Sequence, residues 1–112
     1  MKIVKTKEMP IVDTPHKVDA RKLYDTEHAV TVHITLQPGE KLIRHITPVD
    51  VFFYVLEGTG IVEVGDEKQE VSKDTLIDSP ARIPHCWYNE SEGVLRFLVV
   101  KVPKPLEETK LL

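Results

Sequence analysis

The sequence is nearly free of cysteine and contains no long apolar run. Cys86 is its single cysteine, so no disulfide can form within the chain and the fold must depend on burial of apolar side chains. This thiol content suits a reducing compartment, and we expect a cytoplasmic location. No apolar run approaches the roughly 18–20 residues that span a bilayer, and Met1–Glu8 lacks the apolar stretch of a signal peptide. We therefore expect no membrane partner.

The sequence also lacks an excess of charge of either sign. Its 15 Lys and Arg residues are scattered among 18 Asp and Glu residues, which gives a formal net charge of −3. Binding to a nucleic-acid backbone needs a basic stripe that releases counterions, and none is present. The length of 112 residues is close to the commonest domain size. We expect one domain with one core and no nucleic-acid partner.

What the sequence does contain is a series of short strand patterns. Between residues 29 and 36, Val30, Val32, Ile34 and Leu36 alternate with smaller or polar residues, which predicts a strand with one buried face. Pro38-Gly39 then predicts a turn. No segment shows a convincing helical period, so the pattern favours an all-β barrel or sandwich. Further strands are predicted at 51–56, 61–64, 69–71, 75–77, 85–88 and 95–102.

The two ends of the chain are less regular. Residues 1–28 contain Pro10 and Pro15, which limit any helix, and we expect an extended arm or edge strands there. Such an arm covers a sheet edge or exchanges with a second subunit, so we expect a homodimer. Residues 29–103 are predicted to form the barrel. Two prolines after Val102 end the sheet pattern, and residues 104–112 are predicted to form a tail.

From Gln37 to Asn89 the sequence resembles the cupin family. Gly39 and His45 match the first glycine and first histidine of the first cupin motif, and Gly58 matches its closing glycine. His85 matches the histidine of the second motif. The resemblance implies a double-stranded β-helix, or jelly-roll, barrel. It also implies one divalent metal ion in the barrel, held by three histidines and a glutamate.

Two of the four implied metal ligands are missing. The second histidine falls on Thr47, and the glutamate falls on Val51. The neighbouring Asp50 would replace the glutamate only if a β-bulge turned its side chain to the other face. Two glycines of the second motif fall on Asp74 and Arg82, which alters turn geometry.

His45 and His85 are therefore the candidate metal ligands, because each occupies a family ligand position and imidazole suits several divalent metals. The alternative is that both are hydrogen-bonded inside a polar cavity without metal. His33 points to the face opposite Val32, toward solvent or a partner, and is a further candidate ligand. His16, in the irregular arm, is given no role.

A ligand pocket is predicted beside the two histidines. Trp87 and Asn89 share the strand parity of His85, and with Thr47 and Val51 they would form its wall. The alternative is that Trp87 fills the core with Phe97 and a neighbouring phenylalanine. Cys86 has the opposite parity and is expected to be a buried apolar residue rather than a nucleophile.

Three functions remain open on these residues. The first is a cupin that binds a divalent metal through His45 and His85 together with a small metabolite, with a metal-dependent reaction that the sequence does not specify. The second is a metal-free barrel that binds or senses a small ligand. The third is an oligomerisation module with idle histidines. Serine hydrolase triads, phosphate-binding glycine loops and glycosidase carboxylate pairs have no counterpart in the sequence.

Overall fold

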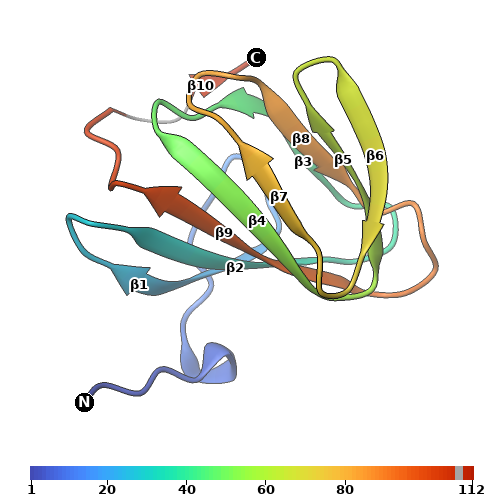
Figure 1. The fold of residues 1–112 in the computed structure, drawn as a ribbon. Helices are drawn as coiled ribbons and strands as arrows, with labels where there is room; N and C mark the ends of the chain where they lie inside the picture. Colours follow the sequence, from blue (N-terminus) through green and yellow to red (C-terminus); the bar gives the residue numbers. More distant parts are fainter. Residues whose placement is uncertain (108–109) are drawn as a thin grey trace.

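The computed structural model describes residues 1–107 and 110–112, and it consists of two facing five-stranded antiparallel sheets (Figure 1). Within these residues no helix has the length and apolarity needed to cross a bilayer. The predicted all-β jelly roll is confirmed. In the described part of the chain the helical content is one 3₁₀ turn, η1 (Thr6–Glu8). In spatial order, the first sheet contains β1 (Asp19–Asp25), β2 (Val30–Leu36), β9 (Leu95–Val102), β4 (Asp50–Glu57) and β7 (Leu76–Ser79), and the second contains β10 (Lys110–Leu111), β3 (Lys41–Ile46), β8 (His85–Tyr88), β5 (Thr59–Val64) and β6 (Glu67–Ser72).

Alternation of apolar residues explains why the strands form and which face they bury. In β2, Ile34 and Leu36 are buried and point into the barrel, whereas Thr35 between them points outward. β9 repeats the pattern with buried Leu95 and Phe97. The strands predicted at 85–88 and 95–102 have these bounds in the structure, because both are bordered by turn residues.

Three aromatic rings fill the middle of the barrel. Trp87 is fully buried and stacks on Phe97 with ring centroids 4.2 Å apart, while Phe53 meets Trp87 edge-on at 5.4 Å. Such contacts contribute about 0.5–1.5 kcal/mol each beyond the apolar area that they bury. Trp87 is therefore a core residue here, which matches the alternative interpretation of its sequence position.

A β-bulge interrupts the pairing of β3 with β8. Leu42 pairs with Trp87 and His45 pairs with His85, so two residues of β3 lie opposite the single residue Cys86. The bulge lets Leu42 and His45 point into the barrel although they are three residues apart. It also releases the backbone groups of Ile43 from the ladder.

Both ends of the chain add strands to the barrel. Within residues 1–28, β1 pairs with β2, and the Arg21 guanidinium ties the arm down by donating to the backbone oxygens of Thr6, Lys7 and Met9. Within the tail, β10 pairs with β3. The outer edge of β1 pairs with no strand of the described part of the chain. The homodimer stays a prediction that rests on this edge.

The two positions where the family pattern has glycine keep a left-handed backbone. Asp74 has φ 64° and Arg82 has φ 67°. Asp74 is a residue type that tolerates this region, whereas a long side chain such as arginine is strained there by its Cβ. The glycine geometry of the motif is thus retained by other residues.

Arg82→Gly should therefore stabilise the fold. Relief of the strained φ outweighs the extra chain entropy of glycine, and we expect the free energy of unfolding to rise by roughly 0.5–1 kcal/mol. Arg82→Ala is the matched control, because it removes the same exposed side chain, with its 3.8 Å contact to Glu107, but keeps the Cβ. Urea unfolding measures both; an equal gain in the two variants would contradict the strain argument.

Candidate functional site

A cavity of about 220 Å³ lies between the N-terminal arm and the inner faces of β2, β3 and β9, with β10 at its side. Its volume corresponds to about seven water molecules, enough for a small organic molecule. Eight of its twelve lining residues are aliphatic. They are Val12, Pro15, Ala20, Val32, Ile34, Leu42, Val99 and Leu111, and the polar ones are Thr14, His16, His45 and Lys101.

His45, which lines this cavity, is in direct contact with His85, which does not line it. The two Nε2 atoms are 3.0 Å apart. His45 Nδ1 lies 2.6 Å from the carbonyl oxygen of Ile43, which accepts only, so His45 donates there and its neutral Nε2 is an acceptor. His85 must then donate from Nε2, and its Nδ1 accepts from the Ser79 hydroxyl at 2.6 Å. One arrangement of protons therefore satisfies the whole chain of hydrogen bonds.

The environment keeps these rings neutral. Burial, followed by the neighbouring His45 and Lys101, lowers the pKa of His85 to about 3. Burial also lowers the pKa of His45, although its hydrogen bond to Ile43 acts in the opposite direction. At neutral pH neither imidazole carries a charge.

His16 of the arm is a third imidazole at the site, which sequence reasoning had given no role. The backbone N–H of Ile43 donates to His16 Nδ1 at 2.8 Å, so in the neutral ring Nε2 carries the proton. Burial, together with His45 and Lys101, lowers the pKa of His16 to about 4. Its ring centroid is 4.8 Å from that of His45. The histidine therefore offers an N–H donor at the cavity.

Lys101 brings a positive charge into the cavity wall. It shares the inward parity of Phe97 and Val99 on β9 and lines the cavity. No carboxylate lines the cavity, and none in residues 1–107 and 110–112 is within ion-pair distance of its ammonium. Burial, with a contribution from Lys22, lowers the pKa of Lys101.

The other predicted pocket residues do not line this cavity. Thr47 and Val51 are buried, and the Thr47 hydroxyl lies 3.5 Å from His85 Nε2. The Asn89 amide is used by the turn that follows β8, since it donates to the carbonyl oxygens of Leu36 and Gly93 at 2.8 Å each. The cavity therefore lies toward the arm, while aromatic rings fill the barrel beside Trp87, and a ligand pocket formed by Thr47, Val51, Trp87 and Asn89 stays a prediction.

Two further candidates lie away from the histidine pair. Asp50 is exposed, and its carboxylate accepts from the backbone N–H of Ala81 at 2.8 Å; the bulge that would turn it inward is absent at this position of β4. His33 is buried on the outer face of β2, where Arg96 Nε donates to its Nε2 at 3.1 Å. Neither joins His45 and His85.

These residues do not fit the four-ligand metal site that the cupin resemblance implies. Of the four motif positions, His45 and His85 offer nitrogen ligands to one point, whereas the other two carry a hydroxyl and an isopropyl group. The nearby Lys101 adds positive charge, and no carboxylate of residues 1–107 and 110–112 pairs with it. Within the described residues, no group of three or more His, Cys, Asp or Glu side chains is arranged to hold a metal ion.

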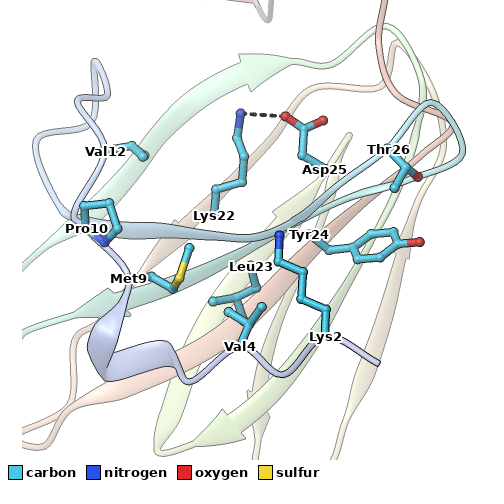
Figure 2. A pocket seen from close by; sticks show the side chains of 10 residues that line it. All are labelled: Lys2, Val4, Met9, Pro10, Val12, Lys22, Leu23, Tyr24, Asp25 and Thr26. Carbon is cyan, nitrogen blue, oxygen red and sulfur yellow. Dashed lines mark hydrogen bonds and ion pairs between the residues drawn. The ribbon is translucent and has the colours of Figure 1, made fainter.

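A larger hollow of about 420 Å³ lies outside the barrel, between the arm and β1 (Figure 2). Val4, Met9 and Leu23 converge there, and Lys22 turns toward Asp25, with which it forms a 3.2 Å ion pair. This hollow holds no histidine, and the ammonium of Lys22 has a carboxylate partner. These features are those of a packing contact between the arm and β1, so we take the inner cavity as the candidate site.

The neutral state of His85 makes stability depend on pH. The unfolded chain takes up a proton at this residue below a pKa of about 6.5, whereas the folded chain does so only below about 3. The stability is therefore fully present above about pH 6.5 and is lost as the pH falls toward 3.

Between pH 7 and pH 5 we expect His85 alone to cost roughly 1–2 kcal/mol, measured by urea unfolding at the two pH values. The His85→Gln variant keeps hydrogen-bonding groups but does not titrate. Between pH 7 and pH 5 its free energy of unfolding should therefore fall by roughly 1–2 kcal/mol less than that of the native chain. Equal losses in the native chain and the variant would show that His85 is not held neutral.

Comparison with known proteins agrees with the fold and the motifs. The family model described as "Cupin domain" matches residues 32–101. The uncharacterised protein MJ0764 of Methanocaldococcus jannaschii is 28% identical over 85 residues, which are 75% of this chain and 73% of that protein.

Solved structures show the same likeness. TT1209 from Thermus thermophilus superposes with a TM-score of 0.80 at 29% identity, over 94% of this chain and 100% of that one. The polyketide cyclase RemF from Streptomyces resistomycificus superposes with a TM-score of 0.85 at 24% identity, over 100% of this chain and 85% of that one. With two jelly-roll sheets, both cupin motifs and a family match over more than half its length, the chain belongs to the cupin family.

Proposed function

We propose that this cupin binds a small molecule in the cavity between the arm and β2, β3 and β9, and that it does so without a bound metal ion. The observation that carries the proposal is the state of the two motif histidines, His45 and His85. They contact one another through Nε2 at 3.0 Å, and the two other motif positions hold Thr47 and Val51, which add neither an imidazole nor a carboxylate to the pair. Beside them is a cavity with eight aliphatic and four polar lining residues.

The cavity has the make-up of a binding site rather than of a packing defect. A defect would be lined by apolar groups alone and would tend to collapse or stay dry. Here His16, His45 and Lys101 converge from the arm, β3 and β9, three segments far apart in the chain. Polar groups that converge on an apolar cavity orient a ligand.

A second candidate is a two-histidine metal site completed by water and ligand. It is favoured by one observation, namely that both Nδ1 atoms are already hydrogen-bonded, to the Ile43 carbonyl and to Ser79, as they are in histidines that bind metals through Nε2. The incomplete ligand set and the positive charge of Lys101 oppose it.

Metal content separates the two candidates. Protein purified without an affinity tag or chelator, and again after loading with Zn²⁺, Mn²⁺, Fe²⁺ or Ni²⁺ and dialysis, should contain far less than one metal ion per chain by plasma mass spectrometry. Near-stoichiometric metal that is lost in His85→Ala would establish the second candidate and reject the metal-free proposal.

Ligand binding is tested by filling the cavity. In a thermal-shift screen of small organic molecules, a compound at 100 times its dissociation constant adds about 2.7 kcal/mol to the folded state. Val99→Phe places a ring in the cavity and should abolish the response. Val100→Phe is the matched control on the outer face of the same strand. No response from the native chain, or an equal response from Val99→Phe, would contradict the proposal.

A further inference from the structure

We propose that the molecule held in this cavity is a small organic acid, with its anionic group between the Lys101 ammonium and the His16 Nε2–H and its apolar part against β2 and β9. The inference rests on the proposed function and adds the chemical class of the ligand.

Within the described residues, the charge of the cavity is positive and has no carboxylate partner. The inward positions of β9 are Leu95, Phe97, Val99 and Lys101, so a lysine occurs where the strand pattern calls for an apolar residue. A partly buried ammonium without a partner is unfavourable. Because no carboxylate of the described residues pairs with it, an anion from outside is the group that would complete its environment.

The two groups proposed to meet the ligand's polar end are donors, whereas the hydroxyl of Thr14, another polar lining residue, already accepts from the backbone N–H of His16 at 3.1 Å. The Nδ1 atom of His16 is occupied by the Ile43 N–H, which leaves Nε2–H as the free group of the ring. The acceptor Nε2 of His45 is already taken by His85. Lys101 and His16 therefore offer protons and no acceptor, a set that suits an oxyanion and discriminates against a cation.

The remaining lining selects an organic anion over an inorganic one. Apolar side chains such as Val32, Ile34 and Val99 form most of the wall, and a hydrated ion such as phosphate or sulfate would bury none of its surface against them. A carboxylate attached to a small ring or branched chain satisfies both the donors and the aliphatic wall. The cavity volume of about 220 Å³ limits the ligand to a small molecule.

Benzoate and benzamide are matched probes, because they share size and shape and differ in charge. By titration calorimetry we expect benzoate to bind at least 10-fold more tightly than benzamide. Lys101→Met should remove this preference, and its affinity for benzamide should stay within about twofold of that of the native chain. Lys41→Met, on an exposed residue of β3, removes the same charge elsewhere and should leave the preference intact.

The role of His16 is tested by His16→Asn. The Asn Oδ1 can accept the Ile43 N–H in place of Nδ1, but the residue has no donor at the Nε2 position. We expect benzoate affinity to fall several-fold with little change for benzamide. Lys101→Met also has a folding readout: loss of an unpaired, partly buried charge should leave the melting temperature unchanged or raise it, so lost binding cannot be assigned to unfolding.

The outcomes separate the ligand class from the proposed function. Equal affinity for benzoate and benzamide, or a preference that survives Lys101→Met, overturns the organic-acid inference and leaves the small-molecule site in place. Failure of both probes to bind overturns the inference as well. The proposed function itself fails only if no compound in the wider screen stabilises the native chain in a manner blocked by Val99→Phe.

Discussion

The bulge in β3 is the constraint on which the geometry of the site depends. By placing two residues opposite Cys86, it takes Ile43 out of the regular ladder and leaves its peptide groups free to bond side chains. The Ile43 N–H then fixes the ring of His16, and its carbonyl oxygen fixes the ring of His45. One irregular residue thereby sets the proton position on two imidazoles, and through His45 on a third.

At the site, burial of apolar groups stabilises the fold, whereas burial of a charged group destabilises it. The aliphatic wall and the aromatic core stabilise the barrel by removing apolar surface from water. The same burial lowers the pKa values of the histidines and of Lys101 by reducing the solvation of their charged forms. A chain selected for stability alone would carry an apolar residue at this position, and this departure is the basis of the organic-acid proposal.

Much of the fold was predictable from residues close together in the sequence. Strand alternation predicts β2, an apolar run predicts β9, and turn residues bound β8. Arg82 and Asp74 kept the backbone conformation of the glycines that they replace. The bounds of β1 were not predictable in the same way, because its sequence mixes charged residues with few apolar ones and it forms by pairing with β2 and by the contacts of Arg21.

The site was predictable only in part. The motif positions point to His45 and His85, which do meet in the structure. The parity of β9 contained the signal for Lys101, since it continues the inward series of Phe97 and Val99. His16 carried no local signal: its place depends on how the arm folds back onto a bulge 27 residues away. The direction of Asp50 could not be predicted without knowing whether β4 has a bulge at that position, and it has none.

Several walls of the cavity come from outside the segment that defines the family. Val12, Thr14 and His16 precede residues 32–101, and Leu111 follows them, yet all four line the same space as Lys101. Terminal segments change in length and sequence more freely than barrel strands, because fewer contacts constrain them. Relatives that agree at every barrel position can therefore differ in what they bind, so ligand preference should be compared across cupins by their terminal segments as well as by their shared motifs.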